Sequence, residues 1–208
     1  LDLSLGDRRQ YNKRKLKLSE TTFEKTTNLK VLNLRGNYIK LEGNFLQHLS
    51  QLKHLNLYDT IILDSDNNDI FSSLKHLEKF EFFNNQPCES FKLYKLSELV
   101  NLKELCLKIT EHDLHQFREM LRSKMKRGEV EPPNPTYDDL CYFILRDLTK
   151  LKHLDLSECN LINIDKKFFS QMKDLSVLRL EENNIQHIPD DTFDCLSNLE
   201  KITLYANP

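Results

Sequence analysis

Apolar residues recur along this chain in short leucine-rich blocks at nearly constant spacing. LKHLNL at residues 52–57 returns as LKHLDL at 151–156, with the relatives LKVLNL at 29–34 and LKELCL at 102–107. The blocks are 23, 25, 25, 49, 24 and 24 residues apart, and the value of 49 corresponds to two periods. Seven units therefore begin at Leu29, Leu52, Leu77, Leu102, Leu151, Leu175 and Leu199. Self-similarity at this period indicates a repeat architecture.

Each unit predicts a short β-strand followed by a turn. The first, fourth and sixth positions are apolar in every unit, and residues of a strand alternate between its two sides. One unit cannot bury its own leucines, but stacked neighbours can, so we expect a parallel sheet. The ninth positions can satisfy backbone groups in the buried turn. They are Asn37, Thr60, Asn85, Thr110, Cys159, Asn183 and Asn207.

A second apolar pair lies six and three residues ahead of most units, as at Phe169 and Met172. With the segment IQHIPDDTFDCLSNLEKITLYANP at 185–208, this pattern resembles the typical leucine-rich repeat of secreted and ectodomain proteins. Toll-like receptors and lamprey variable lymphocyte receptors share it. The resemblance covers about three quarters of the chain. It implies an α/β solenoid, a horseshoe with a parallel concave β-sheet and an irregular or short-helical convex side.

The sequence predicts a single leucine-rich repeat domain over residues 1–208, with about eight repeats. Leu1 falls in frame inside a repeat, because LDLS fills positions four to seven. The chain ends at LYANP, where proteins of this family commonly continue into a cysteine-rich cap. We therefore expect the chain to be a segment of a longer protein.

Residues 111–144 interrupt the repeats and form an insertion. Leu114, Phe117, Met120 and Leu121 share one face of a predicted helix, which we expect Gly128 to end. Because EPPNP at 131–135 would break any strand, we interpret the insertion as a surface excursion that rejoins the repeats at residue 145. It could contact a ligand or be open to proteolysis, but the favoured interpretation is a tolerated surface loop.

Composition narrows the function to binding. The 30 Lys and Arg nearly balance the 32 Asp and Glu, so no nucleic-acid footprint is visible, and no apolar run approaches the roughly 18 residues of a membrane span. Glycine occurs only four times, and no G-x-S-x-G or H-E-x-x-H motif is present. His112, Asp113 and His115 lack a clear further ligand, which favours a plain surface helix over a metal site. We expect no enzyme activity, no cofactor and no metal.

Cysteines and glycosylation motifs leave the compartment open. The nearest match to an N-glycosylation motif, Asn134-Pro135-Thr136, is disqualified by its proline. The lack of such a motif in this sequence modestly favours an intracellular protein. The repeat explains Cys106 and Cys159, which occupy an outward strand position and the ninth position. A disulfide between Cys88 and Cys141 is one weakly supported pairing for the looser regions.

If this chain follows the family, binding occurs on the concave face, through the third, fifth, seventh and eighth positions of each unit. Tyr58 and Phe83 are expected to make an apolar contact, whereas Asp155, Glu158, Glu181 and Glu182 would form an acidic patch suited to a basic partner. For any single residue, simple solvation is the favoured alternative. The candidate residues are Arg35, His54, Asn56, Tyr58, Asp59, Lys79, Glu81, Phe83, Glu104, Lys108, His153, Asp155, Glu158, Arg179, Glu181, Glu182, Lys201 and Tyr205.

The resemblance implies a non-catalytic protein-recognition module. The first hypothesis is a ligand-binding segment of an innate-immune-type, Toll-like receptor ectodomain or of a secreted recognition protein, extracellular or endosomal, with a protein ligand and a receptor dimer as its partners. The second is a cytoplasmic scaffold or adaptor that uses the same face. The third is the substrate-recruiting arm of a larger enzyme.

Overall fold

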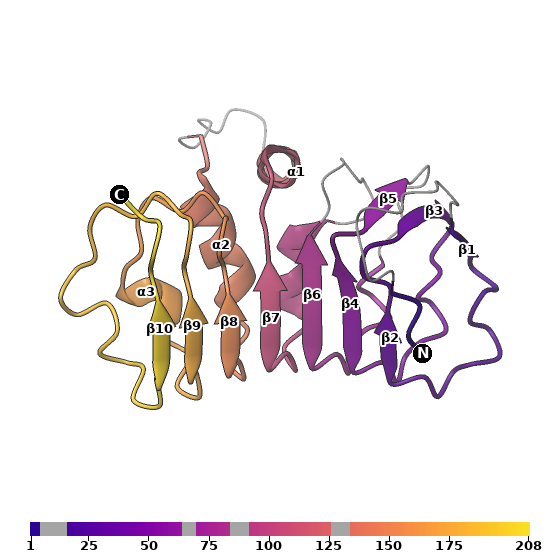
Figure 1. Ribbon diagram of the computed structural model, residues 1–208. Helices are drawn as coiled ribbons and strands as arrows, with labels where there is room; N and C mark the ends of the chain where they lie inside the picture. Colours follow the sequence, from indigo (N-terminus) through magenta and orange to yellow (C-terminus); the bar gives the residue numbers. More distant parts are fainter. Residues whose placement is uncertain (5–15, 64–69, 84–91, 126–133) are drawn as a thin grey trace. The chain divides into compact units, whose positions relative to one another are not determined.

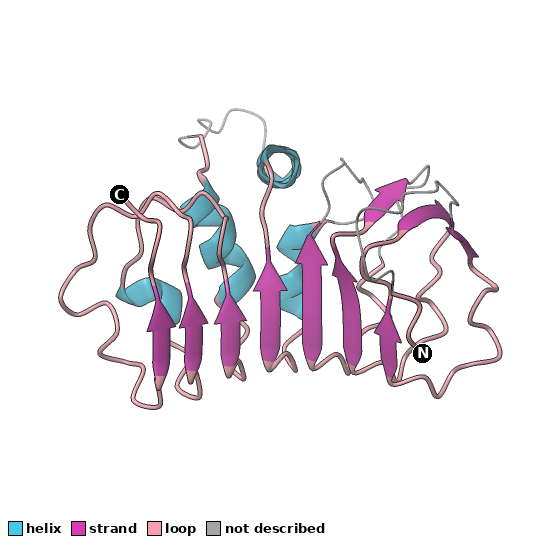
Figure 2. Cartoon of the chain, viewed as in Figure 1, coloured by secondary structure: helices cyan, strands magenta, loops and turns pink. Residues whose placement is uncertain are grey.

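The computed structural model describes residues 1–4, 16–63, 70–83, 92–125 and 134–208 (Figure 1). The chain forms two compact units. Unit 1 comprises Leu1–Phe91 and Glu98–Lys108, and unit 2 comprises Lys92–Ser97 and Ile109–Pro208. Short parallel strands dominate both units, and a few helices lie in the segments that connect them (Figure 2). A 3-10 helix, η2 (Leu93–Glu98), buries Leu93 and Leu96.

The main sheet of unit 1 contains one strand from each leucine block. Its parallel strands β2 (Val31–Asn33), β4 (His54–Tyr58), β6 (Lys79–Phe83) and β7 (Glu104–Leu107) are neighbours in that order. The fourth positions align in register, with Leu55 paired to Phe80 and Phe80 to Leu105. The predicted frame and parallel pairing are therefore confirmed for unit 1.

Unit 1 also contains a second parallel sheet that the sequence did not predict. Its strands are β1 (Leu16–Ser19), β3 (Tyr38–Glu42) and β5 (Ile61–Leu63), with β3 in the centre. Ile39 and Ile62 from this sheet are completely buried. Each of these repeats is therefore hydrogen-bonded to its neighbour at two places, on the main strand and beyond the turn.

Unit 2 repeats the same pattern with strands of three residues each. Strands β8 (His153–Asp155), β9 (Val177–Arg179) and β10 (Lys201–Thr203) pair in parallel, with β9 in the centre. The short helix α3 (Lys166–Phe169) follows β8 along the chain and is capped by Asp165, whose side chain accepts from the Lys167 N–H. An aspartate in this position satisfies a backbone donor that the first helical turn leaves unpaired.

The apolar positions of the repeat form the core. Of the twenty-one first, fourth and sixth positions, all are buried except Leu29, Leu199, Ile202 and Leu204, which are half-buried. The second apolar pair ahead of each unit is also buried, apart from the half-buried Phe193. The core is thus a column of leucines and phenylalanines that each repeat extends by one layer.

The ninth-position ladder is confirmed at several repeats. The Asn37 side chain donates 2.8 Å to the Leu3 carbonyl of the preceding turn, and the fully buried Thr60 hydroxyl donates 2.9 Å to the carbonyl of Leu34. Asn183, which is 4% exposed, has the most hydrogen bonds. Its nitrogen donates to the carbonyls of Leu156, Leu180 and Glu181, and its oxygen accepts from the N–H groups of Cys159 and Leu161.

Two ninth positions behave differently from the expectation, and one lies outside the described residues. Thr110 caps a helix instead of a turn, because the chain leaves the repeat pattern directly after it. Cys159 places a thiol in this position, which donates a weak S–H hydrogen bond, 3.7 Å to the Ser157 carbonyl. Asn85 falls in the segment 84–91, which is not described.

The frame assigned to the first residues is confirmed. Asp2 forms a parallel bridge with Asn33, the fifth-position residue of the next repeat. The Leu3 N–H donates 2.8 Å to the Asn33 carbonyl, which continues the same pairing. Leu3 thus occupies a sixth position. Its carbonyl accepts from the ninth-position Asn37 of the next repeat, just as the sixth-position carbonyl of Leu156 accepts from Asn183.

The first half of the insertion is helical, as predicted. Its second half also contains a helix, which was not predicted, and the insertion is not a loosely attached loop. Helix α1 (Glu111–Lys124) buries Leu114 and Phe117, and helix α2 (Tyr137–Leu145) buries four of its nine residues. The Phe117 ring lies 5.2 Å from the ring of Phe143 on α2. These contacts contradict the surface-loop interpretation, because both helices contribute side chains to the core of unit 2. The expected stop at Gly128 lies outside the described residues.

Polar contacts also hold the two helices together. The Arg118 guanidinium donates to the Pro135 carbonyl through two nitrogens, at 3.1 and 3.0 Å, and to Glu111 at 3.1 Å. The Tyr137 hydroxyl donates to the other oxygen of Glu111. Burial, together with the hydrogen bond to Glu111, raises the pKa of Tyr137 to about 12. The start of α2 is thereby tied to the first turns of α1.

Candidate binding face

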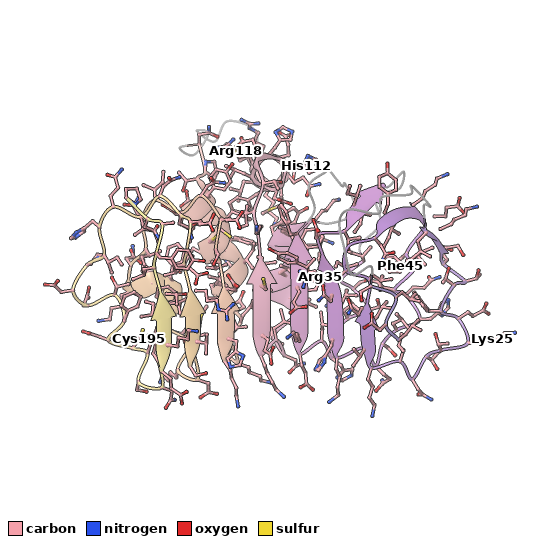
Figure 3. All side chains as sticks on the ribbon, in the orientation of Figure 1. Lys25, Arg35, Phe45, His112, Arg118 and Cys195 are labelled. Atoms are coloured by element: carbon pink, nitrogen blue, oxygen red, sulfur yellow. The ribbon has the colours of Figure 1, made fainter. Side chains whose placement is uncertain are left out.

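The outward strand positions of each unit lie on the side of the main sheet opposite the leucine core. This side, which carries the third, fifth, seventh and eighth positions, is called the exposed sheet face below. The strands β4 and β6 show the alternation directly, with core residues buried and the residues between them half-buried or exposed. Figure 3 shows side chains such as Arg35 projecting from the strands of unit 1.

All eighteen candidate residues have solvent access on this face. In unit 1, Arg35 and His54 are exposed, and the other eight candidates are half-buried. In unit 2, Asp155 and Glu181 are half-buried, whereas the remaining six are exposed. The most exposed aromatic candidate is Tyr205, at 65%.

The seventh positions of unit 1 form one contiguous group, called the row-seven cluster. The rings of Tyr58 and Phe83 lie 5.9 Å apart, which confirms the expected aromatic contact on paired strand residues. The Arg35 guanidinium lies 5.3 Å from the Tyr58 centroid, and the Lys108 ammonium lies 4.7 Å from the Phe83 centroid and 5.8 Å from that of Tyr58. Two aromatic rings are thus flanked by two cations.

The carboxylates of the same face lie nearer the start of the strands, where they pair with lysine side chains. Lys79 lies 2.9 Å from Glu104 and 3.3 Å from Glu81. The Asn56 amide also donates to Glu81. The hydrogen bond to Glu104 is the main reason that the pKa of Lys79 is raised. At the foot of the strands, Lys53 and Lys103 each lie 2.7 Å from Glu78 and lower the pKa of this carboxyl to about 2.

Five of the six described eighth positions adopt a left-handed backbone that was not predicted from the sequence; the exception is Ile109, which precedes helix α1. Their φ angles are 75° at Gly36, 57° at Asp59, 57° at Glu158, 54° at Glu182 and 57° at Ala206. Non-glycine residues adopt this conformation infrequently, so its recurrence shows that the repeat imposes it. The available signal was the glycine of the first unit, which marks the position where the strand turns sharply.

The expected acidic patch of unit 2 is partly neutralised within the face. Asp155 lies 3.6 Å from the Arg179 guanidinium on the neighbouring strand. Glu181 accepts a 3.0 Å hydrogen bond from the Ser157 hydroxyl. Glu158 and Glu182 are both exposed. The four acidic residues are near one another along two adjacent repeats, but two of them are already engaged by a partner.

No catalytic or metal-binding arrangement is found among the described residues. His112 lies 3.0 Å from the Gln116 side chain, and Asp113 forms a capping box with Thr110. Burial raises the pKa of Asp113, against the hydrogen bonds from Thr110. The described part of the chain holds no cluster of three or more His, Cys, Asp or Glu side chains suited to a metal ion. Within the same residues, no helix combines the length and apolarity of a membrane span.

Two buried thiols lie together in unit 2. Cys141 on α2 is 1% exposed and Cys159 is fully buried, and both are free thiols. A hydrogen bond to Cys159, followed by burial, raises the pKa of the Cys141 thiol well above its ordinary value. Cys88, the other half of the disulfide considered from the sequence, lies outside the described residues.

Comparison with protein families identifies the repeat. Residues 11–120 match a BspA type leucine rich repeat region, and residues 149–208 match a leucine rich repeat model. No curated protein matches the chain. Together the two matched ranges include most of the strands described above.

Solved structures share the fold at low sequence identity. The Toll–Spatzle complex of Drosophila matches with 18% identity and a TM-score of 0.57, over 93% of this chain and 23% of the other. Internalin C2 of Listeria monocytogenes matches with 18% identity and a TM-score of 0.54, over 90% and 76%. A complex of Latrophilin 3, Unc5D and the leucine-rich repeat part of FLRT2 matches with 20% identity and a TM-score of 0.54, over 93% and 58%.

The length of the match differs among these structures. This chain spans less than a quarter of the matched Toll chain and less than two thirds of the chain in the Latrophilin 3 complex. At identities of 18% to 20%, the similarity to these structures shows a shared fold alone. Proteins built from these repeats typically present a rigid surface to protein partners and are not enzymes. The two family matches, the parallel strands and the ninth-position ladder agree that the chain belongs to the leucine-rich repeat family.

Proposed function

We propose that this chain is a non-catalytic protein-recognition module, the ligand-binding segment of an innate-immune-type receptor ectodomain or of a secreted recognition protein. Its exposed sheet face binds the partner through the candidate residues named above. The chain acts in the extracellular or endosomal space, as part of a receptor that dimerises.

The observation that carries this proposal is the chemistry of the exposed sheet face. A face that served only to keep the repeat hydrated would place isolated charges on its strands. Here Tyr58 and Phe83 instead form a ring pair on adjacent strands, with the Arg35 guanidinium over the Tyr58 ring and the Lys108 ammonium over the Phe83 ring. Aromatic and arginine side chains dominate protein-binding energetics, and a rigid sheet limits the entropy lost on binding.

Photo-crosslinking tests which side of the repeats meets a partner. A photoreactive amino acid is placed at the exposed positions His54 or Lys201 of the sheet face, in the full-length protein in its own cells. Matched controls carry it at Lys25 and Lys166, which are exposed on other surfaces. We expect crosslinks to partner proteins from the sheet face and few from the controls. Equal or stronger crosslinking at the control positions would overturn the proposal.

A cytoplasmic scaffold or adaptor is the second candidate, and one observation favours it. Cys141 and Cys159 are neighbouring free thiols, and an oxidising compartment would favour their pairing. Intact mass of the native protein before and after reduction and alkylation separates the two candidates. A disulfide, or attached sugar elsewhere in the full-length protein, supports the receptor. Free thiols and an unmodified mass support the adaptor.

A further inference from the structure

We infer that Cys141 and Cys159 form a disulfide that fixes helix α2 of the insertion to the turn after β8. Both residues belong to unit 2, and in the structure neither is in a disulfide. The inference goes beyond the proposed function, because it assigns a covalent modification site that lies outside the exposed sheet face. The reagent that it requires is a small disulfide, such as oxidised glutathione.

Asp138 binds α2 to this turn. Its carboxylate accepts from the backbone N–H groups of Ile162 and Asn163, at 3.0 and 3.1 Å, and from the Asn163 side chain at 3.3 Å. Hydrogen bonds to a charged acceptor are among the stronger ones in proteins. The three bonds therefore hold the first turn of α2 beside residues that follow Cys159 by three and four positions.

The next turn of α2 continues the same contact. Cys141 and Tyr142 follow Asp138 by three and four residues, so all three side chains lie on one side of the helix. The Tyr142 ring lies 6.3 Å from the ring of Phe168 on α3, in an edge-to-face arrangement. Cys141 therefore lies between two residues through which α2 contacts the repeat of Cys159.

Both thiols are enclosed by this contact. Cys141 is 1% exposed and Cys159 is fully buried, and the two side chains are hydrogen-bonded to each other. The other described cysteines, Cys106 and Cys195, are half-buried. The hydrogen bond brings the two buried sulfurs close enough for side-chain rotation to join them, whereas another pairing would require one of them to leave the core.

The disulfide would supply at this repeat what asparagine supplies elsewhere. The ninth-position Asn183 donates from its side chain to the Leu156 carbonyl of the preceding repeat. Cys159 occupies the ninth position of the repeat that follows the insertion, where the preceding element is α2. A thiol is only a weak hydrogen-bond donor, but it can form a covalent bond with a second thiol. The bond to Cys141 would thus join the insertion to the stacked repeats.

The reaction consists of two successive thiol–disulfide exchanges. One cysteine, as thiolate, attacks a sulfur of oxidised glutathione, which forms a mixed disulfide and releases one glutathione thiolate. The second cysteine, as thiolate, then attacks the protein sulfur of the mixed disulfide and releases the second glutathione thiolate. Two electrons pass from the cysteines to the reagent, and the two thiol protons pass through solvent to the released thiolates.

Burial makes this reaction slow in the folded protein. The hydrogen bond to Cys159, followed by burial, holds the pKa of the Cys141 thiol well above its ordinary value, and only the thiolate is reactive. Exchange therefore proceeds during folding, or while α2 is transiently detached from the turn. Once formed, the disulfide is itself buried, which shields it from reducing thiols.

Peptide mapping of the full-length protein tests this inference. The protein is first reduced, so that the result is independent of its compartment. It is then either exposed in its folded state to oxidised glutathione or refolded in a mixture of oxidised and reduced glutathione. Remaining thiols are blocked with N-ethylmaleimide before trypsin digestion and mass spectrometry. Trypsin cleaves after Arg146 and Lys150, so Cys141 and Cys159 remain together only if they are bonded.

We expect the linked pair of peptides in the refolded sample and, more slowly, in the folded one. The bond should raise the thermal melting temperature by about 5 °C or more relative to the reduced protein. This rise should persist in the matched control, Cys106→Ser with Cys195→Ser, and should be absent in Cys141→Ala.

Three results would overturn the inference. The first is that Cys141 and Cys159 stay reduced in both samples, and the second is that Cys141 pairs with Cys88, the disulfide considered from the sequence. The third is a linked peptide pair without any rise in melting temperature, which would show that the bond does not fix α2. None of these results concerns the exposed sheet face, so the photo-crosslinking experiment decides the proposed function separately.

Discussion

Replacing Asn183 by alanine is the sharpest test of the ninth-position ladder. The Asn183 oxygen is the acceptor for two buried N–H groups, those of Cys159 and Leu161, both at 3.0 Å. Its nitrogen donates 2.9 Å to the Leu156 carbonyl and 3.0 Å to the Leu180 carbonyl. The change therefore removes the partners of groups in two successive repeats.

The magnitude follows from counting the groups that lose a partner. An unsatisfied buried donor costs roughly 1–3 kcal/mol, and two N–H groups are left in this state. The Leu180 carbonyl keeps a hydrogen bond from Asn207 at 2.9 Å, so it adds little to the loss. We therefore expect Asn183→Ala to lower the free energy of unfolding by about 3–5 kcal/mol.

Far-UV circular dichroism during guanidinium unfolding is the assay, because the chain contains no tryptophan. Asn184→Ala is the control, since the same side chain is removed at the next, exposed position. This control should change the free energy of unfolding by less than about 0.5 kcal/mol. Equal unfolding midpoints for the two variants would refute the view that the ladder asparagine stabilises the stacked turns.

Three further predictions concern other parts of the chain. Gly36→Ala and Gly43→Ala should each cost stability, because both glycines have positive φ angles that alanine rarely adopts. The Glu20 side chain that a Cβ at Gly43 would meet is exposed and can move aside, so unchanged thermal melting of either variant would contradict this. Phe117→Ala should destabilise unit 2 by about 3–5 kcal/mol, and the exposed Arg122→Ala on the same helix by less than about 0.5 kcal/mol, in chemical unfolding; similar values would mean that α1 is not part of the core. The Glu78 carboxyl should titrate near pH 2 by NMR. Because folding lowers its pKa, its contribution to stability is complete above about pH 4.5 and is lost as the pH falls toward 2. A titration midpoint at the ordinary value for glutamate would show that Lys53 and Lys103 do not pair with Glu78 in solution.

Much of the fold was predictable because the repeat is regular in its buried positions. Leu55, Phe80 and Leu105 pair in register because each fills the same layer of the core. The Tyr58–Phe83 contact followed from the same frame, since residues at equal positions of successive units lie on adjacent strands. Side-chain placement across repeats could thus be read from spacing alone.

The missed features lie outside the positions that set the repeat frame. The strands β3 and β5 follow the same spacing, since Tyr38 pairs with Ile61 and Ile39 with Ile62, but these are tenth and eleventh positions, beyond the predicted strand and turn. The shared face of Leu114 and Phe117 was predicted, but its burial in the core and the second helix α2 were not. Both helices of the insertion begin with a capping box, at Thr110 and Thr136. That motif could have been recognised in the sequence as Thr followed by Asp at the third helical position.

The second sheet of unit 1 affects how its repeats can separate. Neighbouring repeats of unit 1 are joined along β2–β4 and again along β3–β5, on either side of the turn. In unit 2 the described strands form a single ladder through β8, β9 and β10. Under tension, a coil of unit 2 would have to open this ladder, the hydrogen bonds of Asn183 and, beyond the turn, only an isolated bridge between Asn163 and His187. The repeats joined by β3 and β5 would have to open a second sheet as well, so this part of unit 1 should resist separation more strongly.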